Sequence, residues 1–121
     1  DTMQFVRPDI STICLGQAAS AAAVILAGGA KGKRYALEHS RILIHQPSSE
    51  GGGQASDIEI TAREIKKLKH ELYEVIATHT HKDVELVAKD CDRDFWMTAA
   101  EGKAYGLVDE VLLTNPRKVK K

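Results

Sequence analysis

A single stretch decides the fold: TICLGQAASAAAVILA, residues 12–27. Residues 10–15, which lead into this stretch and form its first part, are apolar and β-branched, which is typical of a buried strand. The pattern breaks at Gly16, and from Ala18 onward the composition is nearly all alanine with Val24, Ile25 and Leu26, which favours a helix. The stretch therefore predicts a strand that turns sharply into a helix, with Ser20 in the first helical turn.

Ser20 is the nucleophilic side chain of this junction, and two interpretations are open for it. A hydroxyl in a first helical turn lies near unpaired backbone N–H groups and the positive end of the helix dipole, which can stabilise an oxyanion. Ser20 can equally serve as the helix N-cap, with no chemistry at all. The stretch alone does not decide between these interpretations.

Composition narrows the class of protein. A chain of 121 residues forms one domain, and 17 basic against 17 acidic residues give a net charge of zero with histidine neutral. This balance argues against nucleic acid or a membrane surface as partner, and the basic residues 117–121 are expected to be a solvated terminus. Two cysteines, Cys14 and Cys91, are too few for a disulfide scaffold and fit a reducing compartment. No apolar run has the length of a membrane span.

The rest of the chain alternates between strand and helix patterns. A glycine-rich turn at 28–33 precedes an extended piece at 34–36 and a buried strand at 41–44, an order that predicts an α/β layer with a right-handed crossover. Further along, we expect helices at 83–90 and 99–105, the second opened by a capping box, and a last strand at 107–113. Residues 1–5 resemble the end of a helix.

One helix is too long for a domain of this size. Apolar residues recur at helical spacing over 56–79, after a capping box of Ser56 and Glu59. Such a helix is about 36 Å long, so we expect it to protrude and its apolar stripe to contact a second subunit. The glycine-rich segment 48–54 before it is either a surface linker or a mobile edge that pairs with a peptide or a subunit.

Three side chains could form a proton relay. Ser20 lies at the strand–helix junction, His45 follows the buried strand, and Asp94 lies in a turn after a helix. Hydrolytic acyl transfer needs a hydroxyl, an imidazole and a buried carboxylate that fixes the imidazole tautomer, although other Ser, His and Asp residues are available. No Gly-x-Ser-x-Gly elbow is present, which disfavours an α/β-hydrolase. His79 and His81 lack further ligands at suitable spacing, so no metal site is predicted.

Six blocks of the chain resemble one family. They are GQAAS at 16–20, AKGKRY at 30–35, IHQP at 44–47, GQASDIEI at 53–60, DRD at 92–94 and AYGLVD at 104–109. In this order they resemble ClpP, the family of Clp protease proteolytic subunits. The resemblance implies a crotonase-like spiral of repeated ββα units. Residues 1–121 would be a single domain, the C-terminal two-thirds of a subunit, with a protruding handle at about 46–80 and a head formed by the remainder.

The resemblance also implies roles for individual residues. Ser20 would be the nucleophile of a serine endopeptidase, His45 the general base and then acid, and Asp94 the carboxylate that orients the imidazole. The backbone N–H of Ala21 would be an oxyanion donor. Asp92 and Arg93 would form the contact between opposing rings.

For partners, the resemblance implies two stacked heptameric rings, homomeric or mixed, and an AAA+ unfoldase such as ClpX, ClpA or ClpC. The unfoldase would use ATP and feed unfolded polypeptides to this subunit, which itself would need no cofactor. The expected location is the cytoplasm, or an organellar stroma or matrix in a eukaryote. No nucleic acid or membrane partner is implied.

The chain departs from the family pattern in two ways. Ala21 and Ala22 follow Ser20, where the family usually has Met and then Gly or Ala, but the backbone N–H of Ala21 is retained. Family members also begin well before Asp1, with a Pro-Gly-Gly segment that supplies a second oxyanion donor. We therefore expect this chain to be part of a longer subunit or to need another polypeptide, and to be inactive alone.

Two further functions stay open at this stage. One is a non-catalytic structural paralogue that only completes mixed rings. The other is a crotonase-type acyl-CoA enzyme, a class with a related fold that does not call for His45 and Asp94 together.

Overall fold

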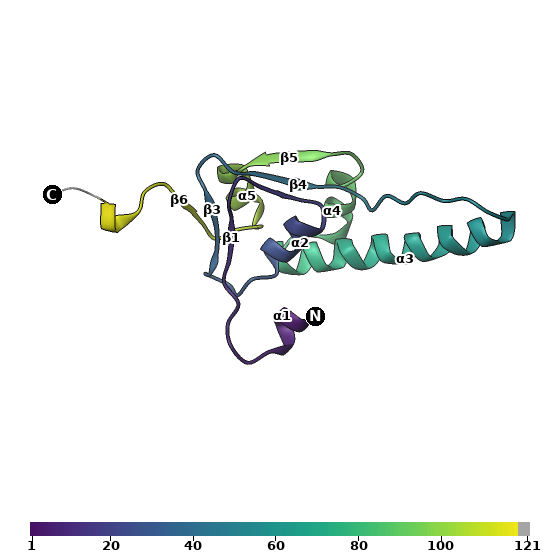
Figure 1. Cartoon of the computed structure of the whole chain (residues 1–121), viewed down its shortest axis with the longest axis horizontal. Helices are drawn as coiled ribbons and strands as arrows, with labels where there is room; N and C mark the ends of the chain where they lie inside the picture. The colour runs from purple at the N-terminus through teal and green to yellow at the C-terminus, as the bar shows by residue number, and fades with distance from the viewer. Residues whose placement is uncertain (119–121) are drawn as a thin grey trace.

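The computed structural model describes residues 1–118, and in this part of the chain six strands form two three-stranded sheets (Figure 1). The first sheet is parallel throughout, in the order β1 (Thr12–Cys14), β3 (Arg34–Leu37) and β6 (Glu110–Leu112). In the second, β2 (Gln17–Ala19) is parallel to β4 (Arg41–Ile44), and β4 is antiparallel to β5 (Phe95–Thr98). Strands β1 and β2 thus lie at sheet edges.

The chain passes twice from the first sheet to the second and then into a helix. β1 and β2 are followed by α2 (Ala21–Ala27), and β3 and β4 are followed by α3 (Ala55–Thr80). Gly16 makes the first crossing possible because its φ of 82° lies in the left-handed region that glycine adopts without steric cost. The predicted α/β fold of repeated ββα units is confirmed.

The predicted start of the helix after the first strand is wrong. Ala18 and Ala19 belong to strand β2, and the helix begins only at Ala21. Alanine favours helix locally, but β2 pairs with β4, where Ala18 lies opposite Ile42 and Ala19 opposite Leu43. Ala18 is buried in the core, so the hydrogen bonds and packing of the sheet outweigh its local preference.

Helix α3 has 26 residues, which makes it about 39 Å long. Figure 1 shows that it projects from the two sheets and that the segment after β4 runs out to its far end before the chain turns back. The capping box expected at Ser56 is wrong, because Gln54 is the N-cap and makes no side-chain capping hydrogen bond. The buried residues of α3, Tyr73, Ile76, Ala77 and Thr80, all lie near its C-terminal end.

The remaining elements are short. They are α1 (Thr2–Phe5), α4 (Val84–Asp90), α5 (Ala99–Tyr105) and a 3₁₀ turn at Pro116–Lys118. The capping box that opens α5 is confirmed, since Thr98 and Glu101 satisfy each other's backbone N–H groups. The last strand is shorter than predicted: the N–H of the buried Leu107 donates to the Gly102 carbonyl of α5 at 2.9 Å, and β6 begins only at Glu110. The expected solvated tail lies outside the described residues from Val119 onward.

The core lies where the two sheets meet the helices. Its largest fully buried side chains include Ile42 and Ile44 of β4, Ile76 of α3 and Met97 of β5. Strand β4 also pairs with β2 on one side and β5 on the other, and this position fixes the residues that follow it. Within residues 1–118, no helix combines the length and the apolar character that crossing a membrane requires.

Candidate active site

Ser20 lies between the end of β2 and the start of α2, in a strained backbone conformation. Its φ is 58° and its ψ is −120°, a region that residues other than glycine rarely adopt. Such a conformation costs about 1–3 kcal/mol and is concentrated at functional sites. The Ser20 side chain is exposed and makes no capping hydrogen bond to α2, so the structure does not support the capping interpretation.

The backbone around Ser20 is fixed to the neighbouring strand. The Ser20 N–H donates to the carbonyl oxygen of Leu43 at 3.0 Å, which extends the pairing of β2 with β4 by one step. Ala21 then opens the helix, and within residues 1–118 its N–H donates to no other backbone or side-chain group. This donor adjoins the Ser20 hydroxyl, as an oxyanion donor would have to.

His45 directly follows β4, at the same end of the sheet as Ser20. Because Ala19 pairs with Leu43 in parallel register, Ser20 comes level with Ile44, one residue before His45. Neighbouring strands lie about 4.8 Å apart. The register of two strands thus brings together two residues that are 25 positions apart in the sequence.

Asp94 directly precedes β5, which runs antiparallel to β4. Ile44 pairs with Phe95, so the same register carried one step further places Asp94 opposite His45. Both residues line a cavity of about 540 Å³. Its other lining residues are Gln46, Pro47, Ser48, Asp92 and Arg93.

The structure therefore gathers the three predicted residues at one end of the sheet β2–β4–β5. Ser20 does not line the cavity shared by His45 and Asp94, and among the described residues no hydrogen bond joins any two of the three side chains. Asp92, Arg93 and Asp94 are all exposed in the turn between α4 and β5, so the expectation of a buried carboxylate at Asp94 is wrong for this chain.

One residue of this region was missed by the sequence analysis. Gln46 donates its backbone N–H to the Cys91 carbonyl at 2.7 Å and its side-chain amide to the Asp92 carbonyl at 2.8 Å. The amide oxygen of Gln46 accepts a hydrogen bond from Lys69 of α3 at 2.9 Å. The sequence signals for Gln46 were its position directly after His45 and its place in the IHQP block at 44–47.

The cysteines are poor alternative nucleophiles. Cys91 is fully buried, and burial, with Asp90 nearby, raises the pKa of its thiol to about 11. Burial also raises the pKa of Cys14 above its ordinary value. Because the thiolate is the reactive form of cysteine, both thiols stay protonated and unreactive near neutral pH.

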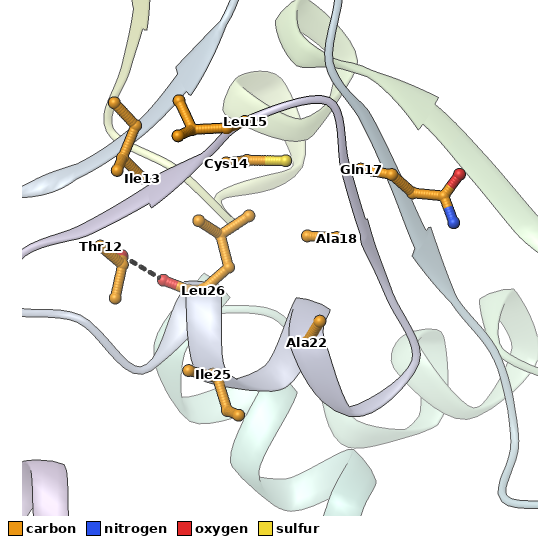
Figure 2. Close-up of a pocket in the computed structure, with 9 residues that line it drawn as sticks. All are labelled: Thr12, Ile13, Cys14, Leu15, Gln17, Ala18, Ala22, Ile25 and Leu26. Carbon is orange, nitrogen blue, oxygen red and sulfur yellow. Dashed lines mark hydrogen bonds between the residues drawn. The ribbon is translucent and has the colours of Figure 1, made fainter.

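A second cavity, of about 350 Å³, opens between β1, β2 and α2 (Figure 2). Figure 2 shows that Ile13, Leu15 and Leu26 surround it from the β1 side and the end of α2, while Ala22 and Ile25 approach from the helix. Thr12 closes one end by donating its hydroxyl to the Leu26 carbonyl at 2.7 Å. The lining is largely apolar, and Ile13, Leu15 and Ile25 are exposed.

The described residues offer no metal centre. Between Asp1 and Lys118, no group of three or more His, Cys, Asp or Glu side chains is placed to hold a metal ion. His79 is half-buried, and burial, with the nearby Arg34 charge, lowers the pKa of its imidazole.

The fold and the sheet edge together define a class: an α/β protein of repeated strand–strand–helix units with a hydroxyl, an imidazole and a carboxylate at one sheet end. Comparison with known proteins identifies the family. The Clp protease family model matches residues 1–115, and the chain therefore belongs to the Clp protease family. The resemblance found in the sequence is confirmed.

Curated relatives agree with this assignment. The chain is 64% identical over 113 residues to an ATP-dependent Clp protease proteolytic subunit of Bacteroides thetaiotaomicron, covering 93% of this chain and 51% of that protein. It is 63% identical over 113 residues to proteolytic subunit 1 of Thermobifida fusca, covering the same shares of the two chains. With the subunit of Porphyromonas gingivalis it shares 56% identity over 115 residues, covering 95% of this chain and 52% of that protein. The chain spans about half the length of the curated relatives it matches.

Proposed function

We propose that this chain forms part of a serine-type endopeptidase subunit of an ATP-dependent Clp protease, which hydrolyses unfolded polypeptides to short peptides. Membership of the Clp protease family supports the protease assignment. The observation that carries the serine mechanism is the strand register, which brings Ser20 level with the end of β4 and Asp94 opposite His45.

The proposed roles follow from the chemistry of the three groups. His45 accepts the proton of the Ser20 hydroxyl as it attacks the peptide carbonyl, and then donates that proton to the leaving amine. Asp94 orients the imidazole and stabilises its charged form. The N–H of Ala21 donates to the oxyanion of the tetrahedral intermediate. No metal or organic cofactor enters this mechanism.

Assembly is part of the proposal. We assign residues 46–80 as a handle between two stacked heptameric rings, homomeric or mixed, and the rest of the chain as the head of a single domain. Exposed Ile58, Ile60 and Leu68 on α3 support this, because apolar side chains far from the core need a covering partner. Asp92 and Arg93 would join opposing rings, and their position next to Asp94 would couple assembly to the site.

The partners and location are proposed on the same basis. An AAA+ unfoldase such as ClpX, ClpA or ClpC would hydrolyse ATP and deliver unfolded polypeptide, in the cytoplasm or in an organellar stroma or matrix. The relatives' names, which describe proteolytic subunits of an ATP-dependent protease, support separate subunits for proteolysis and for ATP hydrolysis.

A covalent probe tests the proposal in the assembled protein that carries this chain. A fluorophosphonate should label Ser20, as located by peptide mass spectrometry, and the protein should cleave a fluorogenic peptide. Ser20→Ala should abolish both signals. Ser48→Ala, a matched exposed serine at the His45–Asp94 cavity, should retain labelling.

Three results would overturn the proposal. An assembled protein that is neither labelled at Ser20 nor active on peptides would support a non-catalytic subunit of mixed rings. Labelling that survives Ser20→Ala would place the nucleophile elsewhere. Binding and turnover of a CoA thioester, without peptidase activity, would support the acyl-CoA enzyme alternative.

A further inference from the structure

Gln46 lies at the point where the pairing of β4 with β5 stops. The last pair of that ladder is Ile44 with Phe95, so His45 and Asp94 are the first residues beyond it. Without another link, the turn that carries Asp94 would be free to separate from the end of β4. Gln46 supplies two links, through its backbone N–H to Cys91 and its side-chain amide to Asp92.

With the last pair of the ladder, the link to Asp92 closes a small ring, made of backbone and the Gln46 side chain. Starting at Gln46, the ring runs back through His45 to the Ile44–Phe95 pair, then through Asp94 and Arg93 to Asp92, which returns to Gln46. His45 and Asp94 lie on opposite sides of this ring. The separation of their backbones is thus set on one side by the sheet and on the other by Gln46.

The hydrogen bond from Lys69 fixes the orientation of the Gln46 side-chain amide. A side-chain amide can present either its oxygen or its NH₂ group in a given direction. The Lys69 ammonium group can only donate, so it holds the amide oxygen toward α3 and leaves the NH₂ group facing the Asp92 carbonyl. The contact therefore links the long helix to the ring of backbone around His45 and Asp94.

We propose that Gln46 is a positioning residue, which holds the Asp92–Asp94 turn against the end of β4 so that Asp94 stays opposite His45, with Lys69 orienting its amide. This inference rests on the proposed function, because it assigns Gln46 a part in the Ser20–His45–Asp94 relay. Gln46 acts through Asp94 and needs no contact with substrate.

A double-mutant cycle tests this proposal in the assembled protein. Gln46→Met keeps the length of the side chain and its backbone link but loses both amide contacts. Misplacing a catalytic group by about 1 Å can cost about a hundredfold, so we expect kcat and the fluorophosphonate labelling rate to fall tenfold or more, with KM within about twofold. In an Asp94→Ala background the same change should lower the labelling rate less than about twofold, because the group being positioned is already absent.

Lys69→Met provides a second, milder variant. It leaves Gln46 in place and removes only the donor that orients it, so kcat should fall by less than in Gln46→Met. The matched control is Lys66→Met, an exposed lysine one turn earlier on α3, which should leave kcat unchanged.

Three outcomes would overturn the positioning role. They are an unchanged kcat in Gln46→Met, an equal loss in the Asp94→Ala background, or equal effects of the Lys69 and Lys66 variants. Failure of the proposed function can be told apart from failure of the positioning role. In the first case the unmodified protein is not labelled at Ser20, and both proposals are overturned together.

Discussion

The guanidinium group of Arg34 forms a two-point ion pair with the carboxylate of Asp109, with Nη2 to Oδ1 at 2.7 Å and Nε to Oδ2 at 2.9 Å. Arg34 also donates to the carbonyl oxygens of Ala27 at the end of α2 and His79 near the end of α3. Its side chain is only 7% exposed. One buried cation thus joins β3, two helix ends and the segment that leads into β6.

The first prediction concerns acid stability. The Arg34 guanidinium holds the pKa of Asp109 below its ordinary value of 3.8, so the folded protein keeps the carboxylate charged more readily than the unfolded chain does. The resulting stabilisation is complete above pH 3.8 and is lost as the pH falls through the lower, folded-state pKa. Asp109→Asn should cost about 3 kcal/mol at pH 7, because it leaves Arg34 buried without a charged partner.

Denaturant unfolding from pH 7 to pH 2 measures this effect. The difference between the unmodified protein and Asp109→Asn should shrink as the pH falls below 3.8. Lys33→Met, which breaks the exposed ion pair with Asp9, is the control and should have a much smaller effect at pH 7. A pH-independent difference for Asp109→Asn would contradict the electrostatic explanation.

A second prediction uses the backbone strain at Ser20. Ser20→Ala and Ser20→Gly both remove the hydroxyl, but only glycine adopts a φ of 58° with a ψ of −120° at low cost. Ser20→Gly should therefore be more stable than Ser20→Ala by about 1 kcal/mol, and neither should be labelled by a fluorophosphonate. Thermal or denaturant unfolding compares the two, and a less stable glycine variant would mean that the conformation carries no strain.

The third prediction concerns the contact between α5 and β4. A Cβ atom added at Gly102 would come within 2.5 Å of Cδ1 of Ile42, which is completely buried. Gly102→Ala should thus destabilise the protein by about 1–3 kcal/mol, although alanine is the better helix former. In an Ile42→Val background, where Cδ1 is absent, the same substitution should be neutral or stabilising. Equal effects in both backgrounds would show that the side chain of Ile42 is not the obstacle.

A fourth prediction concerns assembly through α3. Leu68 is about half exposed, on the part of the helix that projects from the sheets. Under the proposed handle arrangement, Leu68→Glu should shift the protein toward smaller species in sedimentation velocity, because a charge would enter an apolar interface. Thr61→Glu, an exposed polar position on the same helix, is the control. Unchanged sedimentation of Leu68→Glu would exclude this face from the interface.

The sequence analysis predicted those elements that depend on patterns within one short stretch of the chain. The apolar periodicity placed α3 at 56–79 against Ala55–Thr80 in the structure, and the Thr98–Glu101 capping box placed the start of α5 correctly. Strand β2 was missed because alanine favours a helix, whereas the partner that makes Ala18 and Ala19 extended is β4, more than twenty residues away. A single sequence does not display such long-range pairing.

The same limit applies to the site. Residue type and the family resemblance singled out Ser20, His45 and Asp94, but only the registers of β2, β4 and β5 show that they share one sheet end. Nothing in the sequence indicated the strained backbone at Ser20, because a serine occupies a positive-φ conformation in which glycine is usually found. Gln46 was missed because its partners, Asp92 and Lys69, belong to two other elements.

The positions of β1 and β2 at the sheet edges affect the solubility of this chain in isolation. Edge strands are templates for strand addition from neighbouring molecules, and the exposed apolar side chains of Ile13 in β1 and Leu15 directly after it favour such contacts. Prepared by itself at high concentration, the chain should form oligomers or precipitate through these edges. Short extended peptides that occupy them should act as solubilising agents.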